Sequence, residues 1–257
     1  MHPYFTVSIG TSLVLSIPAY SFFACIGLLF MMLFLYFRTQ RAGMKYTRYL
    51  LLIGYMVVGV GIGSKALFVV TQIPVWLENP TLRNLGHIIW TSGFVFYGGL
   101  LGAITGVAVF AKQFHLSFGN LSDLVAPGFP LFHFWGRIGC FFAGCCYGKE
   151  TSWGVAMTDT PNILRIPVQL FEAVCILLIF AMLLYAERKN STASLLRLYL
   201  GVYAICRFIL EFCRGDALRG LWFGLSTSQW VSLAILGYLL ISIICKKEKL
   251  TAKMQSE

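Results

Sequence analysis

Three charged residues, Arg207, Glu211 and Arg214, stand three or four positions apart near the end of one apolar stretch of this chain. On an α-helix this spacing places them within about 60° of one another, on a single face. One carboxylate cannot neutralise two guanidinium groups, and arginine is the side chain best shaped to hold a phosphate through two parallel hydrogen bonds. We therefore expect at least one arginine to bind a phosphate. The alternative is a self-neutralising ladder that locks the helix into a bundle.

Polar residues at the ends of other apolar stretches extend this chemistry. Arg137 lies in Gly136-Arg137-Ile138-Gly139, where the glycines let a ligand or another backbone approach the charge. Gln169 and Glu172 form a polar face about one helical turn long where the next stretch begins. Further candidates are Ser226 and Gln229, Tyr97 beside Gly98 and Gly99, and Tyr20.

These polar residues matter because the chain around them is strongly apolar. Hydrophobic residues make up 58% of the 257 positions and charged residues only 12%. Soluble domains carry about 25% charged residues, so this chain has too little polar surface to cover a water-soluble globule. A mean hydropathy of +0.77 agrees. The composition excludes a soluble enzyme and a disordered regulator and favours an integral membrane protein. The net charge of +10 favours contact with anionic lipid headgroups, not nucleic acid.

Seven apolar stretches are long enough, or nearly so, to cross about 30 Å of hydrocarbon. They cover residues 13–37, 49–70, 88–110, 124–142, 168–186, 195–212 and 226–245. Because lipid offers no hydrogen-bond partner to unpaired backbone groups, we expect every span to be an α-helix. The sequence predicts a single all-α polytopic membrane domain over residues 1–257, ending in a basic cytoplasmic tail at 246–257.

The basic residues of the loops predict the orientation. Alternate loops and the C-terminal tail hold twelve Lys and Arg residues, whereas the opposite loops hold only Arg83, Lys149, Arg165, Arg214 and Arg219. Positive charge accumulates on the cytoplasmic side, so we expect the N-terminus outside and the C-terminus in the cytoplasm. All the polar candidates then fall in the outer half of the membrane. A one-sided polar cavity resembles an enzyme open to one leaflet more than a through-channel.

Three cysteines, Cys140, Cys145 and Cys146, lie close together in the sequence. Their C-x4-C-C spacing is not a usual zinc pattern, and we expect no metal site and no cofactor. A disulfide that uses one of them is an alternative that stays open.

Small residues recur at helical spacing in two of the predicted spans. These are Gly59-x3-Gly63 and Gly98-x3-Gly102-x3-Gly106. Such spacing lets the backbones of two membrane helices approach closely, so we expect these glycines to serve helix packing.

Four motifs carry a family resemblance. They are Gly136-Arg137-Ile138-Gly139-x-Phe141-x2-Gly144-x2-Tyr147-Gly148, Pro167-x-Gln169-Leu170-Phe171-Glu172, Arg207-Phe208-x2-Glu211-Phe212-x-Arg214 and Ser226-x2-Gln229. In this order they resemble the motifs of the bacterial prolipoprotein diacylglyceryl transferases. The family's architecture of seven spans with the N-terminus outside is the one that the loop charges indicate.

The resemblance implies an activity and its partners. The family transfers the sn-1,2-diacylglyceryl group of phosphatidylglycerol to the lipobox cysteine of a prolipoprotein and releases glycerol phosphate. The reaction takes place at the extracytoplasmic side of the bacterial inner membrane, as the first step of lipoprotein maturation. The nucleophilic thiol belongs to the substrate, so the enzyme needs no catalytic cysteine of its own.

The resemblance also assigns roles to residues. Arg137 is expected to hold the lipid phosphate and Arg214 to stabilise the leaving charge, while Tyr97 and Glu211 complete the catalytic set. The residues expected to bind or orient the substrate are Arg137, Tyr20, Arg207, Glu172, Gln169, Gly98, Gly99, Ser226 and Gln229.

Several positions depart from the family pattern. Tyr97-Gly98-Gly99 stands where most members carry His-Gly-Gly, with the histidine as the proposed base. An imidazole accepts a proton near neutral pH and a phenol does so poorly, so we expect Tyr97 to orient a water or the thiol. Cys140 replaces a usual Asn, and Cys145 a usual Glu. Two alternatives to the transferase are a divergent relative with another acceptor or no activity, and a transporter of anionic lipid.

Overall fold

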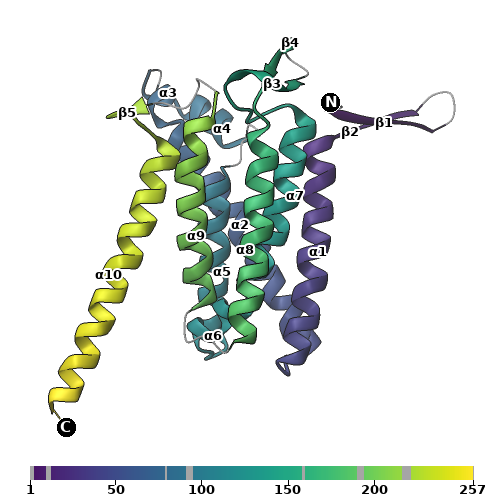
Figure 1. Ribbon diagram of the computed structural model, residues 1–257. Helices are drawn as coiled ribbons and strands as arrows, with labels where there is room; N and C mark the ends of the chain where they lie inside the picture. The colour runs from purple at the N-terminus through teal and green to yellow at the C-terminus, as the bar shows by residue number, and fades with distance from the viewer. Residues whose placement is uncertain are drawn as a thin grey trace. The chain divides into compact units, whose positions relative to one another are not determined.

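A computed structural model describes residues 3–9, 13–78, 80–90, 95–157, 160–189, 194–215 and 221–256. It is mainly helical, as the sequence predicts, with short β-hairpins between some helices (Figure 1). The helices are α1 (Ala19–Arg41), α2 (Tyr46–Thr71), α3 (Ile73–Glu78), α4 (Leu82–Trp90), α5 (Phe96–Gln113), α6 (Phe118–Val125), α7 (Gly128–Ala143), α8 (Val168–Arg188), α9 (Leu195–Leu210), the 3-10 turn η1 (Glu211–Cys213) and α10 (Thr227–Ser256). The strands are β1 (Tyr4–Ile9), β2 (Leu13–Pro18), β3 (Glu150–Met157), β4 (Thr160–Arg165), β5 (Leu221–Trp222) and β6 (Leu225–Ser226).

Among the described residues, four helical segments are long and apolar enough to cross a membrane. They are Ala19–Arg41, Tyr46–Thr71, Val168–Arg188 and Thr227–Cys245. Each of the other three predicted spans also contains a helix, namely α5, α7 and α9. The last two have 16 residues each, about 24 Å at 1.5 Å per residue, which is less than the ~30 Å of hydrocarbon. The number of spans and their orientation stay predictions.

Two of the predicted spans begin later than their hydropathy indicates. The first was expected from residue 13, but Leu13–Pro18 is strand β2, paired antiparallel with β1 from Tyr4↔Pro18 to Ile9↔Leu13. Pro18 has no backbone N–H to donate within a helix, and α1 begins directly after it. The third was expected from residue 88, but α5 begins at Phe96, after Val95 in an extended conformation.

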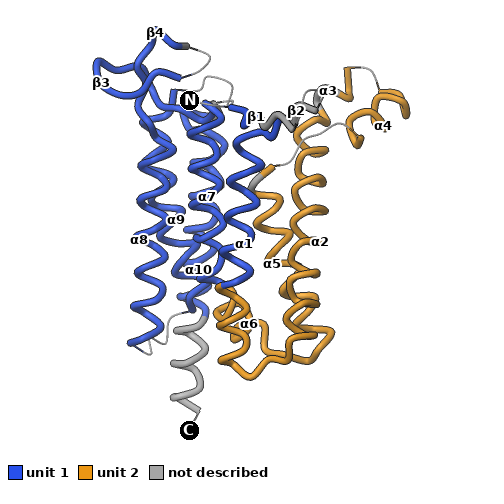
Figure 2. Tube along the Cα trace, turned by 90° about the vertical axis from the view of Figure 1, so that its right-hand side faces the viewer, with its two compact units in different colours: residues 1–33, 126–257 blue, residues 34–125 orange. Residues whose placement is uncertain are grey.

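The chain forms two compact units (Figure 2). The larger unit comprises residues 1–33 and 126–257, and the smaller unit comprises residues 34–125. The single polytopic domain expected from the sequence stays a prediction.

In the larger unit, α7 packs on α8, α8 on α9, and α9 on α10. Successive helices run in opposite directions, so the end of α7, the start of α8, the end of α9 and the start of α10 lie at one end of this unit (Figure 1). The core face of α8 carries Ile176, Ile179 and Leu183, buried at the spacing of one helical face. The sequence therefore brings its polar helix ends together at the end where the β3–β4 hairpin connects α7 to α8.

In the smaller unit, α2 packs along α5 through glycine. A Cβ atom on Gly59 would collide with the carbonyl oxygen of Gly102, and one on Gly63 would collide with that of Gly98. Gly106 lies in the same way against the backbone of Tyr55. The predicted close packing of these two glycine-rich helices is confirmed.

Candidate active site

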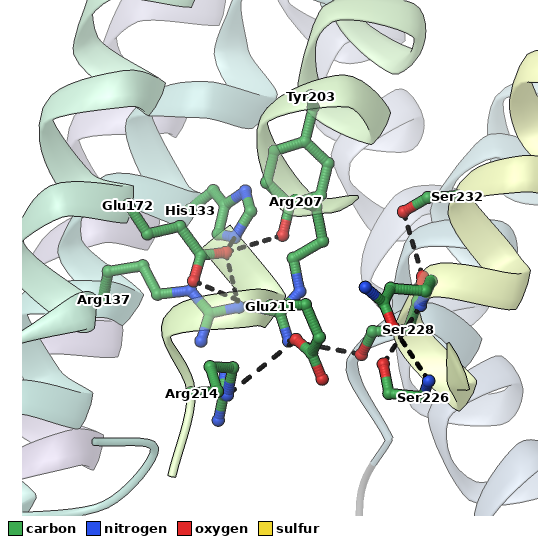
Figure 3. Close-up of polar contacts among 11 residues, drawn as sticks. His133, Arg137, Glu172, Tyr203, Arg207, Glu211, Arg214, Ser226, Ser228 and Ser232 are labelled. Atoms are coloured by element: carbon green, nitrogen blue, oxygen red, sulfur yellow. Dashed lines mark hydrogen bonds and ion pairs between the residues drawn. The ribbon is translucent and has the colours of Figure 1, made fainter. Parts of the chain in front are cut away.

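The carboxylate of Glu172 is the centre of a buried ion cluster in the larger unit (Figure 3). Glu172 lies one turn into α8 and is 1% exposed. Arg137 of α7 approaches its Oε1 with Nη2 at 3.0 Å, and Arg207 of α9 approaches its Oε2 with Nη1 at 3.3 Å. The Tyr203 hydroxyl donates a hydrogen bond to Oε1 at 2.8 Å. One carboxylate therefore joins the guanidinium groups of two neighbouring helices.

The predicted stripe of Arg207, Glu211 and Arg214 continues this cluster. Arg207 Nη2 lies 2.7 Å from Glu211 Oε2, and Arg214 Nε lies 3.9 Å from the same oxygen. Helix α9 ends at Leu210. The 3-10 turn η1 begins at Glu211, and Arg214, which follows it, has an extended backbone. The three residues therefore do not lie on one continuous α-helix, as the spacing predicted. Arg207 and Arg214 nevertheless both face the carboxylate of Glu211, as Figure 3 shows.

The cluster carries a surplus of one positive charge when its histidine neighbour, His133, is neutral. It contains the guanidinium groups of Arg137, Arg207 and Arg214 and the carboxylates of Glu172 and Glu211. Taking charges out of water is costly unless opposite charges and hydrogen bonds compensate them. An anionic ligand would complete the balance, as the spacing of Arg207 and Arg214 predicts.

Buried polar atoms without a hydrogen-bond partner among the described residues include one donor and one acceptor at the cluster. They are Nε of Arg137, a donor, and Oε1 of Gln169, an acceptor. The other end of the Gln169 amide is held, because Nε2 donates to the carbonyl oxygen of Cys145 at 2.6 Å. Buried polar groups in proteins are nearly always paired, so an open donor and an open acceptor favour a ligand that offers both.

The segment after α7 positions Arg214 and Gln169 by backbone pairing. The Gly148 N–H donates to the Ile166 carbonyl at 2.9 Å, and the Gly215 N–H donates to the Tyr147 carbonyl at 3.2 Å. Gly148 also forms an isolated β-bridge with Arg214. A Cβ atom on Gly148 would lie 2.7 Å from Ile166, so only glycine fits between the two flanking segments. The glycine at the end of the first motif therefore holds the arginine of the third motif in place.

Ser226 and Gln229 cap the start of α10. The Ser226 N–H donates to Gln229 Oε1 at 2.9 Å, and the Gln229 N–H donates to Ser226 Oγ at 3.2 Å. This reciprocal pair is a capping box, which satisfies backbone N–H groups at a helix start. Ser228 lies between these two residues in the first turn of α10, and its Oγ accepts a hydrogen bond from Arg207 Nη2 at 3.2 Å. Binding of substrate by Ser226 and Gln229 stays a prediction.

Tyr20 lies at the start of α1 in the larger unit and packs against the first motif. A Cβ atom on Gly139 would lie 3.2 Å from the Tyr20 Cα, so the two backbones are close. Gly139 follows Arg137 by two residues, and the Tyr20 side chain is 48% exposed. An exposed ring at this position can line a lipid site, as the resemblance implies, but that role is untested.

Tyr97, Gly98 and Gly99 lie in the smaller unit, at the start of α5. Gly98 packs on the backbone of Gly63, and a Cβ atom on Gly99 would meet Oγ of Ser64. The two glycines thus have a packing role within this unit. Their expected contact with substrate, and that of Tyr97, stays a prediction.

Sequence reasoning missed three residues of the cluster, namely His133, Tyr203 and Ser228. His133 Nε2 lies 3.9 Å from Glu172 Oε1, and its Nδ1 shares a hydrogen bond with the Tyr199 hydroxyl at 3.2 Å. The missed signal was spacing, because His133 precedes Arg137 by four residues and Tyr203 precedes Arg207 by four. Residues four apart share a helix face, so both rows of polar side chains extend further into the bundle than the charged residues alone.

Comparison with known proteins gives the family. The model of the family described as prolipoprotein diacylglyceryl transferase matches residues 8–245 of this chain. The match includes all four motifs and every residue of the ion cluster. The chain belongs to the prolipoprotein diacylglyceryl transferase family.

Relatives that match 72% to 92% of this chain carry the family's name. The phosphatidylglycerol–prolipoprotein diacylglyceryl transferase of Clostridium tetani is 34% identical over 227 residues, which cover 85% of this chain and 89% of the relative. The enzyme numbered 2 of Clostridium perfringens is 32% identical over 249 residues, 92% of this chain and 94% of the relative. That of Polynucleobacter asymbioticus is 37% identical over 194 residues, 72% of this chain and 73% of the relative.

In this member of the family, the ion cluster consists of arginine guanidinium groups paired with glutamate carboxylates. The described residues hold one group of side chains that could bind a metal ion, formed by Cys140, Cys145 and Cys146. The prolipoprotein diacylglyceryl transferase motifs therefore contribute to two clusters of different chemistry, the buried ion cluster and the group of three cysteine sulfurs.

Proposed function

We propose that this chain transfers the sn-1,2-diacylglyceryl group of phosphatidylglycerol to the thiol of the lipobox cysteine of prolipoproteins. The family and the relatives' names support the reaction. The observation that carries it to this chain is the buried cluster of three guanidinium and two carboxylate groups, whose surplus positive charge lies beside an open donor and an open acceptor. A lipid phosphate supplies the missing negative charge, and its glycerol headgroup supplies hydroxyl donors.

The open polar atoms suit the donor lipid. Nε of Arg137, which has no hydrogen-bond partner among the described residues, can donate to a phosphate oxygen, and Oε1 of Gln169, likewise without one, can accept from a headgroup hydroxyl. Glu172 holds Arg137 from the other side, so the guanidinium keeps one orientation when the lipid binds. Arg137 and Gln169 together favour a phosphodiester with a hydroxylated headgroup. Phosphatidylglycerol is a lipid of this kind.

The chemical step exchanges one bond at the glycerol carbon that carries the phosphate. The substrate thiolate attacks this carbon, a C–S bond forms, the C–O bond to the phosphate breaks, and glycerol phosphate leaves with the electron pair. The thiol proton must depart, and negative charge grows on the phosphate oxygen. Arg137 and Arg214 stabilise this charge, with Glu211 orienting Arg214 and Arg207. Tyr97 orients the thiol or a water that takes its proton.

The loop charges support a location of this chemistry outside the cytoplasm. We infer seven spans with the N-terminus outside and the C-terminus inside, in the bacterial inner membrane, from the loop charges of the sequence. The end of the larger unit that holds the ion cluster then faces the extracytoplasmic side, where exported prolipoproteins present their cysteine.

The test is transfer to a synthetic lipobox peptide by the purified full-length protein in vesicles, read by mass spectrometry of the peptide. We expect a mass increase of one diacylglyceryl group with phosphatidylglycerol and none with phosphatidylcholine. Arg214→Ala should lower the rate by about 10²-fold or more, because it removes a donor that acts on the developing charge. Arg188→Ala is the matched control, since Arg188 is exposed at the far end of α8.

Two results would contradict the proposal. A folded protein that binds phosphatidylglycerol but never modifies the peptide would indicate a relative with another acceptor. Movement of a fluorescent lipid analogue across sealed vesicles, without a covalent product, would indicate a transporter.

A further inference from the structure

Three cysteine sulfurs meet at the end of α7. The Sγ atoms of Cys140, Cys145 and Cys146 all lie within 4.8 Å of one another. Cys140 is in the last turn of the helix, and the other two follow directly after Gly144. The C-x4-C-C spacing is not a usual metal pattern, so the proximity of the three sulfurs is a property of the fold and not of the spacing.

The backbone after α7 explains how two adjacent cysteines turn toward a third. Gly144 ends the helix with φ +73°, and Cys146 also has a positive φ of +62°. Between them, the Cys145 N–H donates to the Cys140 carbonyl at 3.1 Å, which closes the turn over the helix end. Side chains of adjacent residues point apart in extended chain, but the left-handed conformation of Cys146 brings both onto the same side. Such conformations in a residue other than glycine concentrate at functional sites.

The distances suit one shared ion. Zinc binds thiolate at about 2.3 Å, which separates the sulfurs of a tetrahedral site by about 3.8 Å. Sulfur atoms already within 4.8 Å reach that separation by small rotations of their side chains. The ligand set is sulfur alone, which selects soft cations over Mg²⁺ and Ca²⁺. Cys140 is buried and Cys145 is exposed, so one side of the site is open to an entering ion and to a fourth ligand from water.

The electrostatic surroundings suit a thiolate complex. Three thiolates and a divalent cation carry a net charge of minus one. Arg137 lies about one helical turn before Cys140 in α7, and Arg214 forms a β-bridge with Gly148, two residues after Cys146. The turn is also tied to the ion cluster, because Gln169 donates to the Cys145 carbonyl one helical turn before Glu172. A negatively charged metal–thiolate complex here would attract the guanidinium groups of Arg137 and Arg214, which a lipid phosphate also needs.

We propose that Cys140, Cys145 and Cys146 form a binding site for a soft divalent cation of the Zn²⁺ class, with an open fourth position. When occupied, the site weakens the hold of Arg137 and Arg214 on the phosphate of the donor lipid. This second part rests on the proposed transferase function, whereas the binding of the ion does not.

Cadmium is the probe for the binding itself. The reduced, metal-free, full-length protein in detergent is titrated with Cd²⁺ under anaerobic conditions, and the ultraviolet charge-transfer absorption of cadmium thiolate is recorded. We expect saturation at one ion per chain. Cys145→Ser, whose side chain is exposed and easily replaced, should lower the affinity at least tenfold, and the triple serine variant should lose the absorption. Cys25→Ser, outside the cluster, should titrate like the wild type.

Three results would contradict the cadmium site. The first is a reduced wild type that shows no cadmium–thiolate absorption, and the second is a triple variant that keeps this absorption together with a native circular dichroism spectrum. The third is a disulfide, found by thiol counting, that forms again in air, with no cadmium binding after reduction.

A second experiment measures KM for phosphatidylglycerol with and without Zn²⁺. We expect Zn²⁺ to raise KM in the wild type and in Cys25→Ser but not in the triple variant. If cadmium binds while no transfer occurs at all, the proposed function fails and the metal site stands.

Discussion

Glu172 is the residue on which the site depends most. Its carboxylate contacts Arg137 and Arg207 and accepts from Tyr203, and it is almost completely buried. A buried ion network contributes little net stability, because desolvation opposes the attraction of the charges, but it fixes the side chains in one geometry. Arg137 and Arg207 come from different helices, so Glu172 sets the distance between the two guanidinium groups. Preorganised donors of this kind act on a transition state without rearranging when charge develops.

Tyr97 gives the first prediction at this scale. Tyr97→Phe removes the hydroxyl that we expect to orient the thiol or a water, and the rate of peptide modification should fall about tenfold, less than the loss for a true general base. Tyr97→His introduces the residue usual in the family. It should retain transfer and add to the rate–pH profile a group that titrates near the ordinary histidine pKa of about 6.5. A Tyr97→Phe enzyme with the wild-type rate and pH profile would exclude this role.

Residue types and spacing predicted much of the site, but not its pairing. Arg137, Glu172, Arg207, Glu211 and Arg214 were all expected in one cavity, and the structure brings them into one cluster. Which carboxylate meets which guanidinium depends on how three helices pack, and a helical projection of one segment does not contain that information. Tyr203 and Ser228 were missed because tyrosine and serine are common in apolar helices, so their presence there does not indicate a polar network.

At the scale of elements, the contact of α2 with α5 gives a prediction about stability. Gly59→Ala places a methyl group against the carbonyl of Gly102, so the two helices must separate. Gly61→Ala on the same helix meets nothing within 4 Å and replaces glycine by a better helix former. We expect Gly59→Ala to lower the melting temperature of the detergent-solubilised protein by several degrees, through overpacking of about 1–3 kcal/mol. Gly61→Ala should leave it unchanged or slightly raised, and equal melting of the two variants would refute the packing.

Hydropathy located the helices better than the segments between them. All seven apolar stretches contain a helix, yet Leu13–Pro18 is a strand and the β3–β4 hairpin was not anticipated. A short apolar run is compatible with either helix or strand, and the partner strand decides between them. For Leu13–Pro18 that partner is β1, and Pro18 sets the point at which helix α1 can begin.

For the whole molecule, the orientation in the membrane is the property that the loop charges predict. A green fluorescent protein fused to the C-terminus should fluoresce, because it folds in the cytoplasm, and alkaline phosphatase fused at the same point should be inactive. Fusion after Arg188, in the loop between α8 and α9, should give the same pair of results, whereas fusion at Arg165 in β4 should give the reverse. Fluorescence from the fusion at Arg165 would place the ion cluster on the cytoplasmic side and contradict the topology.

In the proposed function, a surplus guanidinium charge in the larger unit holds the phosphate of the donor lipid. The most direct test is KM for phosphatidylglycerol in mixed micelles, compared between the wild type, Arg137→Ala, Arg137→Lys and the control Arg188→Ala. We expect Arg137→Ala to raise KM at least about tenfold, which corresponds to the loss of one charged hydrogen bond. Arg137→Lys should lie between the two, because it keeps the charge but loses the planar fork. A folded Arg137→Ala enzyme with the KM of the wild type would contradict the account.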